Sequence, residues 1–231
     1  MKRIFVFFLV ILIASCGKEK PNLIVTGQVK GLKKGTLYLD RVQDTTVVAI
    51  DSMEINGDPI FELVTFLSEP EVLYLRLQTA NSDPLRIRFF ADKGTTTINT
   101  TLKRFVYDAK IEGSELQKKL EEFNSMLSQF NSKNLELIKE QFEAGEDSTK
   151  LNTVLSESDN LLKRKYLYAI NYALTNKESE VAPYIALSEV YDANLKYLDT
   201  IYNVLPEHIA KSKYGKELAR YISEKKQENN P

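Results

Sequence analysis

The spacing of apolar residues changes at Gly113, and this change constrains the fold more than any other feature of the sequence. Before Gly113, apolar and polar residues alternate in short runs, as they do in strands with one face in water. After it, apolar residues recur every three or four positions, as they do along one side of a helix. We therefore expect an α+β chain, with a β-rich domain at residues 23–112 and a helical domain at residues 113–226.

Eight short strands are predicted before Gly113. Asn56-Gly57 is typical of a hairpin turn, because both central residues of a type I′ turn need positive φ. The loop at residues 31–34 is predicted to form another hairpin. Short strands at this spacing favour an antiparallel β-sandwich or a partly open barrel. The predicted strands are residues 23–29, 35–39, 45–52, 61–66, 71–77, 85–90, 95–100 and 105–111.

The helical domain opens with Ser114 and Gln117, the spacing of a capping box, in which each side chain satisfies a free helix N–H. An apolar stripe runs from Leu116 to Leu137 and Ile138, with an interruption expected at Asn134. A second amphipathic helix follows the break at residues 144–148, so the two should form an antiparallel hairpin. Shorter helices are predicted at residues 179–191, 194–204, 206–210 and 213–225, and a frayed tail at 227–231.

The first 15 residues are predicted to be a signal peptide. Two basic residues precede eleven apolar ones at residues 4–14. As a helix these would span about 16 Å, roughly half of the bilayer core. Residues 13–16, Ile-Ala-Ser-Cys, resemble the lipobox of bacterial lipoproteins. That resemblance implies cleavage before Cys16, acylation of its thiol and new amine, and a tether at residues 16–22. An ordinary secretory signal and an uncleaved anchor are the alternatives.

Composition excludes several classes of site and partner. Lys+Arg number 31 and Asp+Glu 32, and this near-neutral balance argues against a nucleic-acid partner. One cysteine and one histidine exclude a disulfide framework, a CxxC pair and a zinc site built from Cys and His. His208 has no nucleophile motif beside it and is interpreted as a surface residue. We predict no catalytic, cofactor-binding or metal-binding residue, and leave open only a calcium site assembled from distant loops.

Tyrosine is concentrated in the helical domain, where nine of the twelve lie between residues 166 and 221. Tyrosine joins a broad apolar ring to a polar hydroxyl and is favoured at interfaces. Two interpretations stay open: these rings pack the helices together, or they form a surface that contacts a partner or a glycan. The candidates for such a surface are Tyr184, Tyr191, Tyr197 and Tyr202.

Short motifs in the β-rich domain occur in a recognisable order, at residues 27–31, 35–39, 50–52, 92–94 and 111–114. The series resembles DUF4369, a domain of unknown function common in lipoproteins of the Bacteroidetes, over about residues 23–114. The resemblance implies relatives in which a helical segment and a thioredoxin-like domain of the thiol-disulfide oxidoreductase or AhpC/TSA kind follow. No W-C-x-x-C motif occurs in this sequence, whereas disulfide exchange needs an attacking and a resolving thiol.

These features predict a lipoprotein of the cell envelope that is not an enzyme. We expect it in the outer membrane, anchored through Cys16 and facing the periplasm or the cell surface. Its expected role is that of a binding or accessory module for a ligand or a protein partner, such as a transporter component. The alternative is the recognition half of a split or degenerate thiol-disulfide oxidoreductase, completed by a separate thioredoxin-like protein.

Overall fold

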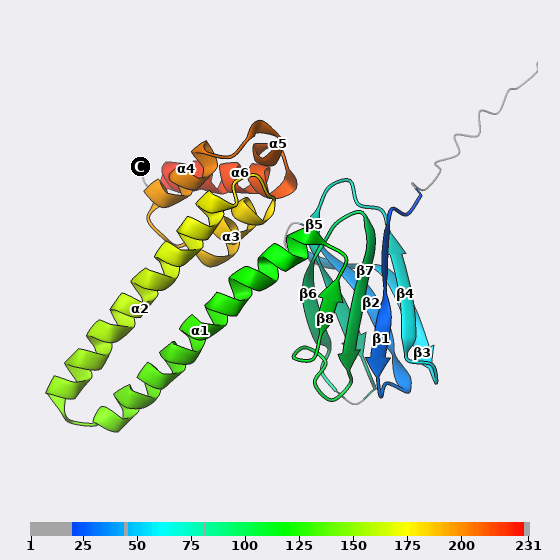
Figure 1. The fold of residues 1–231 in the computed structure, drawn as a ribbon, viewed down its shortest axis with the longest axis horizontal. Coiled ribbons are helices and arrows are strands. Elements are labelled where there is room, and N and C mark those ends of the chain that lie inside the picture. The colour runs from blue at the N-terminus through cyan, green and yellow to red at the C-terminus, as the bar shows by residue number, and fades with distance from the viewer. Residues whose placement is uncertain (1–19, 44–45, 81, 229–231) are drawn as a thin grey trace, which may run out of the picture.

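The computed structural model describes residues 20–43, 46–80 and 82–228 (Figure 1). The predicted signal peptide, Cys16 and residues 229–231 of the predicted tail lie outside the described residues. Within the described ranges, no helix is long and apolar enough to cross a membrane.

Two four-stranded sheets pack face to face and form the predicted sandwich rather than a barrel (Figure 1). Their strand orders are β4-β1-β7-β8 and β3-β2-β5-β6. A core of fully buried aliphatic and aromatic side chains fills the space between them. The α+β class and the division into a sandwich and a helical part are confirmed. The strands are β1 (Leu23–Lys30), β2 (Lys34–Gln43), β3 (Thr46–Asn56), β4 (Ile60–Thr65), β5 (Glu71–Gln78), β6 (Leu85–Ala91), β7 (Gly94–Thr101) and β8 (Lys110–Glu112).

The two predicted hairpins are wrong in their pairing. β1 and β2 lie in different sheets, and so do β3 and β4. Gly57 has the expected positive φ of 101°, but its N–H donates to the carbonyl of Lys33 at 2.8 Å and the chain crosses to the other sheet. Flanking strands such as β1 and β2 each carry a buried apolar face, with Val25 and Leu37 in one core. When the two strands lie in different sheets, their apolar faces pack against each other and both are buried. Neighbouring strands of a single sheet would present both faces to the same side and would not bury each other.

Two further details differ from prediction. β1 and β7 are parallel, with Gly27 opposite Ile98, so one sheet is mixed. The last strand is also short, because residues 103–108 form turns. There the carbonyl of Phe105 accepts from Thr100 Oγ1 at 2.7 Å, and the Phe105 ring is buried in the sandwich core. The first half of the strand predicted at residues 105–111 is therefore a turn, and this turn places the Phe105 ring in the core.

The helical part begins with a long antiparallel hairpin of α1 (Glu115–Ala144) and α2 (Ser148–Thr175), as predicted (Figure 1). The expected interruption at Asn134 is wrong: α1 is continuous there. An exposed asparagine costs a helix only about 0.7 kcal/mol or less, and the burial of Leu137 one turn later outweighs it. The other helices are α3 (Val181–Glu189), α4 (Leu195–Asn203), α5 (Glu207–Ala210) and α6 (Lys213–Glu228).

Half of the predicted capping box is present. Ser114 Oγ accepts from the backbone N–H of Gln117 at 3.2 Å, as expected for an N-cap. The Gln117 side chain does not reach back to the helix N-terminus, as the prediction required. Its Oε1 instead accepts from the backbone N–H of Phe90 at 2.8 Å, and its Nε2 donates to Glu121. Gln117 therefore fixes the start of α1 to strand β6.

A second core joins the helices to the sandwich. Val72 of β5 and Phe90 of β6 point away from the sandwich interior and are buried among the residues of α1, α3 and α6. The helical part thus covers one end of the outer face of the β3-β2-β5-β6 sheet, and the remainder of that face is left open.

Candidate functional site

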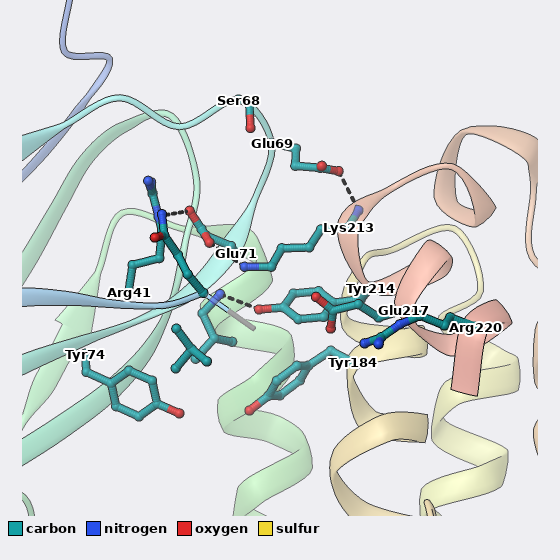
Figure 2. A pocket seen from close by; sticks show the side chains of 13 residues that line it. Arg41, Ser68, Glu69, Glu71, Tyr74, Tyr184, Lys213, Tyr214, Glu217 and Arg220 are labelled. Carbon is teal, nitrogen blue, oxygen red and sulfur yellow. Dashed lines mark hydrogen bonds and ion pairs between the residues drawn. The ribbon is translucent and has the colours of Figure 1, made fainter. Parts of the chain in front are cut away.

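A cleft of about 660 Å³ lies at the junction of the sandwich and the helical part (Figure 2). The ends of β2 and β5 and the loop before β5 form one wall, and α3 and α6 form the other. Charged and aromatic side chains from both parts converge on it. They include Arg41, Glu69, Glu71, Tyr74, Tyr184, Lys213, Tyr214, Glu217 and Arg220.

Glu71 is the centre of the ion pairs in this cleft. Glu71 is 5% exposed, and its carboxylate lies between two cations from different parts of the chain (Figure 2). Arg41 Nε is 2.7 Å from one oxygen and Lys213 Nζ is 2.6 Å from the other. Glu69 in turn accepts from the backbone N–H of Lys213. These carboxylates are therefore engaged in holding α6 against the sandwich.

Two aromatic rings that line the cleft, Tyr184 and Tyr214, pack against the buried ring of Phe90 beneath it. Phe90, Tyr184 and Tyr214 meet edge to face, with centroids 5.6 Å, 5.7 Å and 5.0 Å apart. The Tyr214 hydroxyl accepts from the backbone N–H of Val72 at 2.8 Å. Burial raises the pKa of Tyr214 and of Tyr184, so both phenols stay neutral at physiological pH. The rings therefore supply apolar contact and hydrogen bonds but no charge.

Glu217 and Arg220 also line the cleft and take no part in the ion pairs of Glu71. Partial burial raises the pKa of Glu217, while nearby Lys213 and Arg220 act in the opposite direction. Among the described residues, Arg220 forms an ion pair only with the exposed Glu224, at 3.6 Å. A small polar molecule could meet both signs of charge here. In the described part of the chain, no group of three or more His, Cys, Asp and Glu residues is placed to hold a metal ion.

The four tyrosines predicted as an interaction surface are not brought together at one place. Tyr184 is in the cleft, and Tyr202 packs half-buried against the helical core. Tyr191 and Tyr197 are 51% and 42% exposed. Their contact with a partner stays a prediction. His208 is exposed on α5.

Sequence reasoning missed the cleft because its residues are far apart along the chain. Glu71 and Lys213 are 142 positions apart. Each stands at the end of an element, where a charged residue is ordinary. No local motif marks either one, and only the docking of α6 on the sheet brings them together.

The α1–α2 hairpin carries a second unusual surface, which we call the apolar hairpin face. Five large apolar side chains on it are between 40% and 81% exposed. They follow helical spacings of three, four and seven, so those on each helix share one side. The opposite side is polar, where Glu140 and Glu143 meet Thr153 and Glu157 around a shallow groove. The members of the apolar hairpin face are Leu135, Ile138, Phe142, Leu155 and Leu162.

Comparison with known proteins identifies only the sandwich. Residues 23–120 match the family model described as "Domain of unknown function (DUF4369)". The match spans all eight strands and the first turns of α1, so the resemblance predicted for residues 23–114 is confirmed. No curated protein matches the chain.

Proposed function

We propose that this chain is a non-catalytic binding protein of the bacterial cell envelope, anchored by lipid on Cys16 and docking a protein partner. The observation that carries the proposal is the apolar hairpin face. Contiguous apolar surface of this kind on a soluble domain commonly marks an interaction site.

The size and place of this face support a protein partner. The exposed fractions of its five side chains correspond to about 500 Å² of apolar surface, which is the size of the largest, often functional patch on a typical monomer. Figure 1 shows the hairpin extending away from the sandwich, so a partner can reach it without meeting the sheets. A long two-helix surface with an apolar row suits a partner that adds its own amphipathic helix or helix pair.

Replacing Phe142 by lysine is expected to remove the partner. Phe142 is 81% exposed, so a cation there costs the fold little, and near the C-terminus of α1 it interacts favourably with the helix dipole. The lysine would, however, place a charge within the proposed apolar contact, where it would lose its hydration. Cross-linking in the native cells, followed by mass spectrometry, should show the captured partner reduced about tenfold or more.

Tyr107→Lys is the matched control, because Tyr107 is an aromatic residue that is 82% exposed on the sandwich. It should leave capture unchanged. Equal capture by wild type and both variants would contradict docking through the hairpin. The identity of the protein lost in Phe142→Lys separates the two forms of the proposal. A thioredoxin-like protein would favour a recognition half of a split thiol-disulfide system. A transporter component would favour an accessory module.

The lipid anchor has its own test. Cells grown with labelled palmitate should incorporate the label into the wild-type chain and not into Cys16→Ser. The variant should also keep residues 1–15, because the predicted cleavage requires the lipidated cysteine, and mass spectrometry of the intact chain detects the difference. Labelling of the serine variant to the wild-type level would refute lipidation at Cys16.

A further inference from the structure

The open part of the outer face of the β3-β2-β5-β6 sheet carries three arginines. Arg76 of β5 and Arg86 of β6 are directly opposite in the strand register. Arg88 is two residues further along β6, opposite Tyr74. Tyr38 of β2 is opposite Arg76 on the other side. Neighbouring strands are about 4.8 Å apart and alternate residues about 7 Å apart, so the three guanidinium groups share a small area.

Arg76 is held firmly in place. Its Nε and Nη2 donate to the two oxygens of Asp40, which is fully buried. Its guanidinium also lies over the Tyr38 ring, 3.9 Å from the centroid. The hydrogen bonds that Arg76 donates to Asp40 raise the pKa of Arg76, so its guanidinium stays charged. A bidentate ion pair stacked on an aromatic ring is a preorganised cation.

Arg86 and Arg88 have no such partner. Both side chains are exposed, and neither makes an ion pair with any residue in the described ranges. Asp40 compensates the charge of Arg76, but Arg86 and Arg88 have no such compensation. They lie about 7 Å apart on the same face of β6 and repel each other in the ligand-free protein, and a bound anion between them would remove that repulsion.

We propose that Arg86 and Arg88, with Arg76 beside them, bind a phosphate group, and that Tyr38 and Tyr74 flank it. Arginine presents paired N–H donors that match phosphate oxygens, and the uncompensated charges of Arg86 and Arg88 can balance its two negative charges. None of these residues lies on the hairpin, so this site is independent of the docking proposed above. Such a group could be free phosphate or the headgroup of a lipid.

The test is thermal unfolding of the full chain in rising inorganic phosphate, with chloride keeping the ionic strength constant. Wild type should melt at higher temperature as phosphate saturates the site. Arg86→Gln should bind about tenfold or more weakly, since it loses a charge-assisted contact. Without phosphate, the same variant should be at least as stable as wild type, because the like-charge pair is gone.

Arg104→Gln is the control, since Arg104 is an exposed arginine in the turns between β7 and β8, away from the proposed site, and forms an ion pair with Asp108. It should keep the wild-type response. Phosphate also stabilises proteins generally by exclusion from their surface, and the variants share that effect equally. A short-chain, water-soluble phosphatidic acid that binds more tightly than inorganic phosphate would identify a lipid as the source, and equal binding would identify free phosphate. The same phosphate response in wild type and Arg86→Gln, or no response to either probe, would overturn the site.

Discussion

Replacing Phe90 by alanine is expected to lower the free energy of unfolding by about 3–5 kcal/mol. Phe90 is fully buried although it is on the outer face of its sheet, because α1, α3 and α6 cover it. Its ring meets Tyr184 and Tyr214 edge to face. Alanine would leave a cavity at the junction and remove both aromatic contacts. Helices α3 and α6 should therefore exchange their amide hydrogens faster, while β1 and β7 on the opposite sheet keep their protection.

Denaturant unfolding followed by circular dichroism measures the loss, and Phe142→Ala is the control with the same change of side chain. Phe142 is largely exposed, so its truncation should change stability by about 0.5 kcal/mol or less. A Phe90→Ala protein as stable as the Phe142→Ala protein would mean that the helical part is not held to the sandwich through this ring.

The elements of this protein are predictable from the sequence, but the partners of its strands are not. Alternation along residues 71–77 and 85–90 predicts strands β5 and β6 within a residue at each end. Alternation states which residues face a core and leaves open which strand lies beside them. The turn at Gly57 is the example: the residue type predicts the positive φ, and the crossing to the other sheet depends on burial of two apolar faces.

The helix hairpin also has a part that the sequence predicts and a part that it does not. Its existence follows from the apolar spacing, and its break at residues 144–148 from the residues there. The predicted stripe included both Leu137 and Ile138, yet successive residues of a helix point about 100° apart. Leu137 is buried in the seam, and Ile138 is 40% exposed on the apolar hairpin face. The sequence contains more apolar residues than one seam can bury, and the structure shows that five of the exposed ones make up the apolar hairpin face.

The candidate site in the cleft is the least predictable part. Arg41, Glu71 and Lys213 come from three elements, and nothing near any of them indicates an ion pair. The arginines of β5 and β6 are more predictable than the residues of the cleft. Their alternation with apolar residues predicts that they face outward, but their meeting across the sheet depends on the register of Arg76 with Arg86.

Gly27→Ala is expected to be the most damaging single substitution, costing more than about 4 kcal/mol or preventing folding. Gly27 is in β1 opposite Ile98 of β7, with φ at 153°. A Cβ at this position would lie 1.9 Å from the carbonyl oxygen of Ile98 and 2.6 Å from its carbonyl carbon. Both are backbone atoms of a paired strand, so no side chain can move aside, and the parallel pairing of β1 and β7 must separate.

Gly57→Ala is the control that measures the cost of a positive φ without a steric clash. Gly57 also has a positive φ, but an added Cβ there meets nothing within 4 Å. Its substitution should cost about 1–3 kcal/mol from backbone conformation alone. The measurement is urea unfolding of both variants, with soluble yield as the readout if Gly27→Ala does not fold. Equal stability of the two variants would mean that β1 and β7 approach less closely at Gly27 than the structure shows. A much larger loss for Gly27→Ala is expected, because the missing Cβ at Gly27 is what lets these two parallel strands pair.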